Sequence, residues 1–178
     1  MNNVKLHSKQ IKSVADEILS KTDLINILGE FGKVIIGGSY KYNLMWEPDI
    51  DIVVKCEDPR KASKLALQKL IELKLFQKYE YGDFVNFKRE DRPESYIMNL
   101  RLPYTNQEWE IETWFFKEIP ENQTDKLIET KLNKDNKMTI LQMKQKRAES
   151  GNTKHQISSA EIYKRVLVDG IKNFEELI

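Results

Sequence analysis

The spacing of apolar residues predicts helices near the start of the chain and over its last third, with strands between them. Before residue 30, apolar side chains recur every three or four positions, which is the period of a helix with one buried face. Ser8 is the expected N-cap of this helix. A polar break at residues 21–23 is expected to start a second short helix that ends near Gly32, because glycine favours the position just past a helix.

The middle of the chain changes to a period of two, which is typical of strands that bury one face. Thr105 and Asn106 separate two of these stretches and fit a tight hairpin turn. Asp58 and Pro59 open the long helix of this region, because proline suits the first helical turn. The predicted strands are residues 34–36, 49–54, 79–88, 95–102 and 109–116.

Beyond Pro120 the helical period returns, and Ser158 with Glu161 has the spacing of a capping box. The order of elements predicts an α/β fold, in which helices flank a small, mixed, twisted sheet. We expect a core domain at residues 1–120 and a C-terminal helical segment at residues 121–178, packed on that core. The predicted helices of this segment are residues 122–133, 136–149 and 158–178, and Asp169–Gly170 is a candidate break in the last of them.

Composition narrows the class of protein. The chain has 178 residues, 40% of them apolar and 32% charged, which suits a packed domain rather than a disordered chain. The 29 Lys and Arg against 28 Asp and Glu leave a net charge of +1, so no overall basic field exists for a long nucleic acid. The one cysteine, Cys56, excludes a disulfide scaffold. With neither a signal peptide nor an apolar run of membrane-spanning length, the sequence predicts a cytoplasmic protein without a membrane partner.

Gly37, Gly38 and Ser39 follow a predicted buried strand and are candidate nucleotide-binding residues. Glycine has no Cβ, so a phosphate can approach the backbone closely at such a turn. The Ser39 hydroxyl and the following N–H groups can donate hydrogen bonds to phosphate oxygens, and a helix that begins here would add a partial positive charge. Lys41 can also reach a phosphate from this position, with a solvated surface lysine as the alternative interpretation.

Asp49 and Asp51 follow after a short spacer, on a β-branched strand. Alternate residues of a strand point to the same face, so the two carboxylates are expected to lie close together. Their mutual repulsion costs stability unless a cation lies between them. Mg²⁺ prefers carboxylate oxygens together with substrate phosphates, so this pair beside a phosphate-binding turn predicts metal–triphosphate chemistry.

A catalytic pair of metal ions usually needs a third carboxylate. Glu110 and Glu112 share one face of a later predicted strand, so either of them can complete the cluster. Each feature alone is weak, because Gly-Gly-Ser turns are common and acidic residues on a strand are most often exposed to solvent. Their combination and order favour a nucleotide site.

Residues 34–54 resemble the signature of the nucleotidyltransferase superfamily, which includes DNA polymerase beta and the antibiotic-modifying nucleotidyltransferases. That signature is a strand, a Gly-Gly or Gly-Ser pair, a spacer, and two acidic residues that alternate with apolar ones. Residues 37–39 and 49–52 match it. The resemblance fades in the C-terminal third. It implies the nucleotidyltransferase fold, with transfer of a nucleoside monophosphate from an NTP to a hydroxyl and release of pyrophosphate.

The resemblance also implies a role for each matching residue. The paired aspartates would hold two Mg²⁺ ions, which Mn²⁺ can replace, while Gly38 and Ser39 would contact the β- and γ-phosphates. Glu112 fits the family's third-carboxylate setting better than Glu110 does, although most members have aspartate there. The implied catalytic and metal-binding residues are therefore Asp49, Asp51 and Glu112, with Glu110 as the alternative third ligand.

Basic residues of the helical part often touch the triphosphate in this superfamily. Residues 137–154 are the most basic stretch of the chain, and Lys144 shares a helix face there with Arg147. Lys144 is therefore a candidate nucleotide-binding residue. A solvated helix face is the plainer interpretation of the same residues.

The sequence thus predicts an Mg²⁺-dependent transferase that binds ATP or another NTP and acts on an unidentified acceptor. The nearly neutral charge favours a small molecule or a protein as acceptor over a long nucleic acid. Two alternatives stay open. One is a non-catalytic nucleotide-binding or interaction module with the same fold, and the other is a transferase that acts on an RNA or tRNA end through a basic patch at residues 137–154.

Overall fold

The computed structural model describes residues 2–153 and 156–177, and the chain forms two compact units. The sheet unit consists of Ser13–Lys41 and Glu47–Pro120. The helical unit consists of Met1–Lys12, Tyr42–Trp46 and Glu121–Ile178. The helical unit thus takes in two segments that the sequence-based division assigned to the core.

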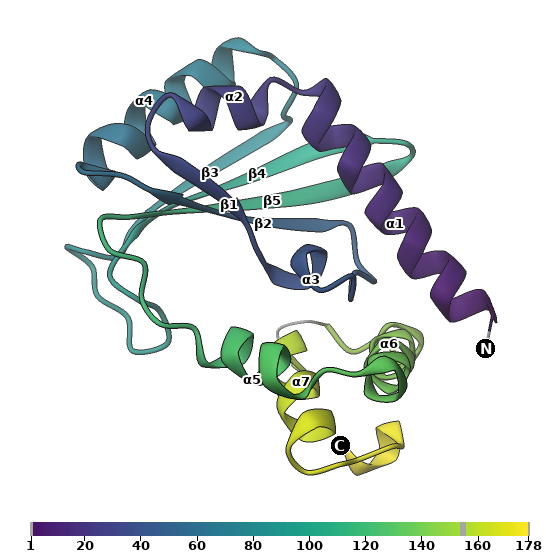
Figure 1. The fold of residues 1–178 in the computed structure, drawn as a ribbon. Helices are drawn as coiled ribbons and strands as arrows, with labels where there is room; N and C mark the ends of the chain where they lie inside the picture. Colours follow the sequence, from purple (N-terminus) through teal and green to yellow (C-terminus); the bar gives the residue numbers. More distant parts are fainter. Residues whose placement is uncertain (1, 154–155, 178) are drawn as a thin grey trace. The chain divides into compact units, whose positions relative to one another are not determined.

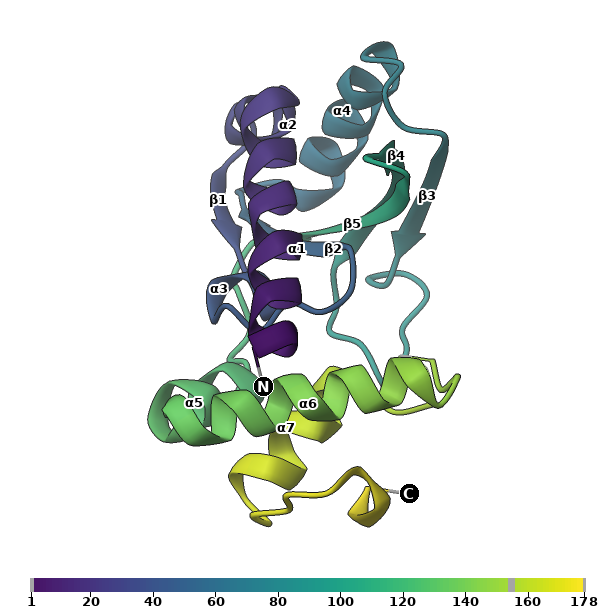
Figure 2. The same cartoon turned by 90° about the vertical axis from the view of Figure 1, so that its right-hand side faces the viewer.

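The sheet unit contains one five-stranded sheet in the order β1-β2-β5-β4-β3 (Figure 1). β2 and β5 pair in parallel, and the other neighbours pair antiparallel, which confirms the predicted mixed sheet. β1 and β3 form its two edges (Figure 2). The strands are β1 (Lys33–Ile36), β2 (Asp49–Lys55), β3 (Lys78–Asp83), β4 (Tyr96–Tyr104) and β5 (Gln107–Phe116).

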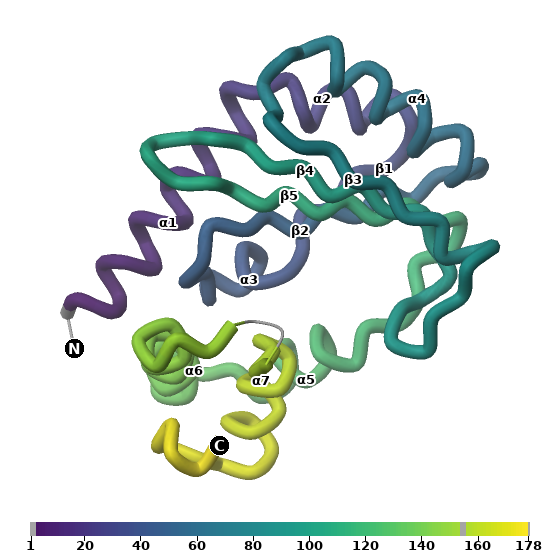
Figure 3. Tube along the Cα trace, turned by 180° about the vertical axis from the view of Figure 1, so that it is seen from behind, coloured from purple at the N-terminus to yellow at the C-terminus, as the bar shows by residue number. Residues whose placement is uncertain are grey.

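Strand alternation gives the sheet two faces of different chemistry. On one face, apolar side chains such as Ile50, Ile52 and Ile111 are fully buried. The helices α2 (Leu24–Gly29) and α4 (Pro59–Glu72) cover one side of the sheet, and the single turn of α3 (Gly38–Lys41) lies on the other side (Figure 3). The residues between the buried ones, which include all four predicted acidic ligands, are half-buried on the α3 side.

Two predicted helix ends are wrong. The first helix, α1 (Asn2–Lys21), begins ahead of Ser8, which is buried inside the helix rather than capping it. The next helix, α2, ends at Gly29, before the predicted Gly32. Gly32 is required for another reason, because a Cβ there would lie 2.2 Å from the backbone oxygen of Lys55. Apolar periodicity identifies the buried face of a helix but not its ends, which explains both errors.

The C-terminal part of the helical unit contains three helices, and each has an N-cap residue whose side chain accepts hydrogen bonds from the first turn. Ser158 accepts a hydrogen bond from the Glu161 N–H and confirms the predicted N-cap. The candidate break at Asp169–Gly170 is confirmed, because α7 ends at Leu167 and Gly170 takes a left-handed backbone conformation (φ +71°). No helix in the described residues has the length and apolar character to cross a membrane. The elements are α5 (Gln123–Lys131), α6 (Lys134–Glu149), α7 (Ser159–Leu167) and the 3₁₀ turn η1 (Phe174–Glu176).

Candidate active site

The register of the three central strands brings the predicted acidic residues together on the α3 side of the sheet. In the parallel β2–β5 ladder, each aspartate stands opposite a glutamate. The antiparallel β5–β4 ladder adds one more polar side chain to each row. The two rows are Asp51–Glu112–Asn99 and Asp49–Glu110–Arg101. Residues far apart in the sequence therefore form one polar surface on adjacent strands.

The glycine turn lies directly against one of these aspartates. The Gly37 N–H donates to the Asp51 carbonyl oxygen at 2.8 Å, so the backbone leaves β1 beside β2. A Cβ on Gly38 would lie 1.8 Å from Asp51 Oδ2, and Gly38 has φ +56°. Only glycine fits these two conditions together. The turn that was predicted to approach a phosphate thus already approaches a carboxylate.

The other predicted phosphate ligands lie on the same turn. Ser39 is buried in α3, and Lys41 is exposed at its end. The helix expected at Ser39 has only four residues, so its dipole adds little and phosphate binding would depend on the N–H groups and the bare glycine backbone. Gly37, Gly38, Ser39 and Lys41 are therefore brought together near Asp51, while their contact with a phosphate stays a prediction.

Replacing Gly38 with alanine should lower the free energy of unfolding by about 3 kcal/mol, because the new methyl group overlaps Asp51 and the backbone is left-handed. Urea denaturation measures this loss. Gly151→Ala is the matched control, because Gly151 has φ +76° but nothing within 4 Å of an added Cβ. It should cost only about 1 kcal/mol. Equal losses at Gly38 and Gly151 would show that the overlap with Asp51 has no energetic weight.

Glu110 and Glu112 differ in the partners they hold. Glu110 Oε1 accepts hydrogen bonds from Asn99 Nδ2 at 2.6 Å and from Arg101 Nη2 at 3.0 Å. Glu112 Oε1 accepts from the indole Nε1 of Trp114 at 2.7 Å. A guanidinium compensates the charge of Glu110, whereas the neutral indole does not compensate the charge of Glu112. The two glutamates therefore differ in a contact that matters for a cation, since the bond of Glu110 to Arg101 would have to open before Glu110 could bind one.

The described side chains do not form a complete site for a divalent metal ion. In residues 2–153 and 156–177, no three His, Cys, Asp or Glu side chains stand in an arrangement that would hold one. Both glutamates are turned toward other donors, and Glu112 is turned toward Trp114. The donors are nonetheless carboxylate oxygens on adjacent strands, and Asn99 Oδ1 is buried on the same face with no hydrogen-bond donor in the described chain. This oxygen-rich set fits Mg²⁺ in kind, and closing it requires Glu112 to rotate away from the indole.

Lys144 lies in the helical unit and is fully buried, as is Arg147. Lys144 Nζ donates to the Leu44 carbonyl oxygen at 3.0 Å and lies 5.2 Å from the centre of the Tyr163 ring. The interpretation of these residues as a solvated helix face is therefore wrong. The pattern of apolar positions could not reveal this, because a buried lysine with polar partners looks like any other lysine in the sequence. The predicted contact between Lys144 and a triphosphate stays a prediction.

Lys144→Ala should destabilise the helical unit by about 2–4 kcal/mol, because it leaves a cavity and removes a buried donor from Leu44. Lys146→Ala is the control, since Lys146 lies on the same helix with an exposed side chain, and it should change stability by less than about 0.5 kcal/mol. Urea denaturation followed by circular dichroism compares them. If the two variants were equally stable, the buried contacts of Lys144 would not stabilise the fold.

Three residues of this surface were not singled out from the sequence: Asn99, Arg101 and Trp114. A signal for the first two exists, because they are the polar positions of an otherwise apolar alternating strand. The turn at Thr105–Asn106 is also visible in the sequence, and both of its residues have positive φ in the structure (47° and 62°). That turn determines which residues of the hairpin stand opposite each other.

The sheet order, the helices on its faces and the glycine turn beside paired acidic residues define a nucleotidyltransferase-like α/β fold. A solved structure described as the polymerase core of TRAMP, an RNA surveillance complex, has a similar fold, with a TM-score of 0.61. The similar region covers 92% of this chain at 20% identity, and it spans only 55% of that chain. At this identity the similarity shows the fold alone. No protein family matches the sequence, and no curated protein does so either.

Proposed function

We propose that the chain is a metal-dependent nucleotidyltransferase that transfers a nucleoside monophosphate from an NTP to a hydroxyl group. The observation that carries this proposal is the register of β2 against β5, which aligns Asp49 with Glu110 and Asp51 with Glu112 beside the glycine turn. The similarity of the fold to a polymerase core supports the same class of reaction.

Different residues of the site have different roles, in phosphate binding and in metal binding. Gly38 and Ser39 bind the β- and γ-phosphates through backbone N–H groups and a hydroxyl, while Gly37 holds the turn against Asp51 and Lys41 lies at the edge of the same turn. Asp49, Asp51 and Glu112 hold the divalent cations, which when bound supply charge neutralisation of the triphosphate and a lower pKa for the acceptor hydroxyl. Positioning and charge stabilisation then account for most of the rate.

In the transfer step, the acceptor oxygen forms a bond to the α-phosphorus. The bond between the α-phosphorus and the bridging oxygen breaks, and pyrophosphate leaves with that electron pair. Glu112 takes the proton of the acceptor hydroxyl. Because Glu112 lies on β5, one strand further from the glycine turn than Asp51, it stands on the side where the acceptor would enter.

The acceptor that we favour is a small molecule or a protein, because a net charge of +1 gives little attraction for a long nucleic acid. The test is direct. The protein is incubated with each labelled NTP, Mg²⁺ or Mn²⁺, and a cell extract, and transferred label and released pyrophosphate are measured. A sample with EDTA and the Asp49→Asn/Asp51→Asn variant are run in parallel.

Label transfer by the wild type alone, dependent on the metal, is the expected result. Tight NTP binding with no transfer and no pyrophosphate release in any extract would favour a non-catalytic nucleotide-binding module. A protein whose thermal stability no NTP changes, with or without metal, would contradict the nucleotide site altogether.

A further inference from the structure

The order of the strands places the groups of the proposed site in a row across the sheet, from β1 to β5. The glycine turn leaves β1, the aspartates lie on β2, and Glu112 lies on β5. If the turn holds the triphosphate, the groups beyond Glu112 on β5, β4 and the loop from β3 to β4 face the acceptor. That loop consists of residues 84–95.

Three aromatic residues, Trp114, Phe116 and Phe84, form a cluster next to Glu112. Trp114 lies two residues further along β5 on the same face, and its indole is parallel to the Phe116 ring at 6.2 Å. Phe84 lies 6.5 Å from Trp114 at an angle of 37°. The Phe84 ring is held against the sheet, since a Cβ on Gly82 would lie 3.1 Å from it. The cluster is therefore anchored by the strands and not only by the loop.

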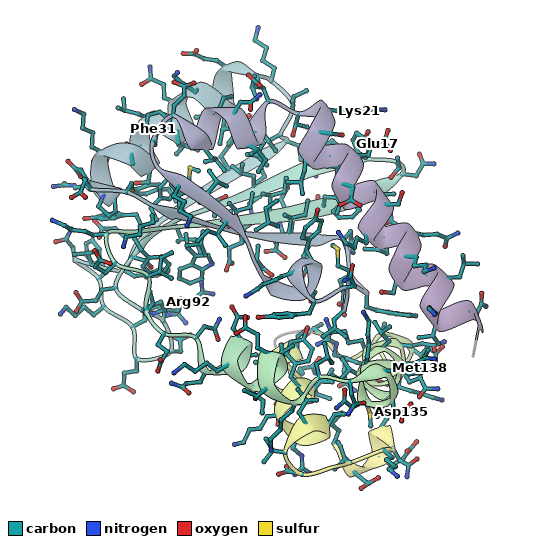
Figure 4. All side chains as sticks on the ribbon, viewed as in Figure 1. Glu17, Lys21, Phe31, Arg92, Asp135 and Met138 are labelled. Atoms are coloured by element: carbon teal, nitrogen blue, oxygen red, sulfur yellow. The ribbon has the colours of Figure 1, made fainter. Side chains whose placement is uncertain are left out.

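The guanidinium of Arg92 lies over two rings of this cluster. The Arg92 side chain is labelled in Figure 4. Its guanidinium carbon is 5.4 Å from the Phe84 ring centre and 5.4 Å from that of Trp114. In the described chain its one ion pair is a long contact of 4.0 Å with Asp91. Asp91 itself accepts two hydrogen bonds of 2.9 Å from Arg89, and that contact lowers the pKa of the Asp91 carboxyl. Arg92 is thus a positioned cation whose nearest carboxylate is already bound by another arginine.

When the flat face of a guanidinium packs on aromatic rings, its N–H groups point outward in the plane of the guanidinium. Two of these N–H groups can donate parallel hydrogen bonds to one carboxylate or phosphate group. The Trp114 indole that supports Arg92 also donates to Glu112 at 2.7 Å, so one ring separates the cation from the third carboxylate. An anion bound to Arg92 would therefore lie close to the reacting hydroxyl.

We infer that Arg92, supported by Trp114 and Phe84, binds an oxyanion of the acceptor, a phosphate or carboxylate group carried near the hydroxyl that receives the nucleotide. The assignment of this anion to the acceptor rests on the proposed function. The anion site itself does not depend on that function. It narrows the acceptor to an anionic compound or an anionic group of a protein.

The experiment uses inorganic phosphate as the probe, without metal or nucleotide, at constant ionic strength. Two-dimensional ¹H–¹⁵N spectra follow the indole N–H signals of the three tryptophans, and Trp114→Phe assigns the signal of Trp114. We expect a saturable shift of that signal alone. Arg92→Gln should weaken phosphate binding at least about tenfold, and Arg92→Lys should restore it only in part, because an ammonium lacks the fork. Arg60→Gln, which alters an exposed arginine on α4, should leave binding unchanged.

Acetate, titrated in the same way, distinguishes a carboxylate of the acceptor from a phosphate. Whichever of acetate and phosphate binds more tightly identifies the anionic group that the site prefers. The Asp49→Asn/Asp51→Asn variant should keep the phosphate response, so a failure of transfer activity can be told apart from a failure of this site. Absence of a saturable shift, or equal affinity in Arg92→Gln, would overturn the inference. Displacement of phosphate by a non-hydrolysable NTP analogue with Mg²⁺ would assign the site to the nucleotide and overturn the acceptor assignment.

Discussion

The Asp49→Asn/Asp51→Asn variant should lose transfer activity by at least about a thousandfold while remaining folded, because in the proposed function both carboxylates bind metal ions, and neither side chain belongs to the buried apolar core. In the protein without metal, two carboxylates on one half-buried face of a strand repel each other. Asparagine keeps the shape that Gly38 packs against and removes the charge. We therefore expect the urea midpoint to stay the same or to rise, by up to about 1 kcal/mol in the free energy of unfolding.

Two measurements separate this result from simple damage. Circular dichroism and urea denaturation report the fold, and pyrophosphate release reports turnover. Mg²⁺ with an NTP should raise the melting temperature of the wild type but not of the variant, since a ligand stabilises only the state that binds it. Glu72→Gln, which neutralises an exposed carboxylate on α4, serves as the control and should change neither quantity. A variant that loses activity because it no longer folds would count against the assignment.

The part of the site carried by β2 was predictable because a single physical rule places it. An alternating, β-branched strand that buries Ile50 and Ile52 on one side must present Asp49 and Asp51 on the other. The sequence predicts the glycine turn because a phosphate can approach a backbone that has no Cβ. The structure adds a second reason for glycine at this turn, because the Asp51 carboxylate lies where a Cβ of residue 38 would be.

The surroundings of the third carboxylate could not be read in the same way. Pairing of β2 with β5 is parallel and joins residues about 60 positions apart, so no local rule determines its register. The partners of Glu110 and Glu112 come from β4 and from β5 itself, and side-chain geometry decides which donor each carboxylate takes. Burial of Lys144 is likewise a tertiary effect, because the carbonyl that accepts its hydrogen bond lies on a distant segment of the chain.

The choice between the two glutamates leads to the second large effect. Glu112→Gln should reduce transfer by about a thousandfold, because the amide cannot serve as a negatively charged ligand or accept the acceptor proton. Its effect on stability should be small, since a glutamine oxygen can still accept from the Trp114 indole. Pyrophosphate release and urea denaturation measure the two quantities on the same preparation.

Glu110→Gln should show the opposite pattern. Arg101 and Glu110 are both half-buried, with side-chain exposures of 28% and 26%, so loss of the carboxylate leaves the guanidinium with only the longer contact of 3.9 Å to Glu108 among the ion pairs of the described chain. We expect a loss of about 1–2 kcal/mol in stability and no more than about a tenfold loss of transfer. The double variant Glu110→Gln/Arg101→Gln should recover part of that stability, because it removes a cation that the distant Glu108 compensates only weakly. If Glu110→Gln instead abolished transfer and Glu112→Gln did not, the third ligand would be Glu110, and the Arg101 ion pair would have to open when metal binds.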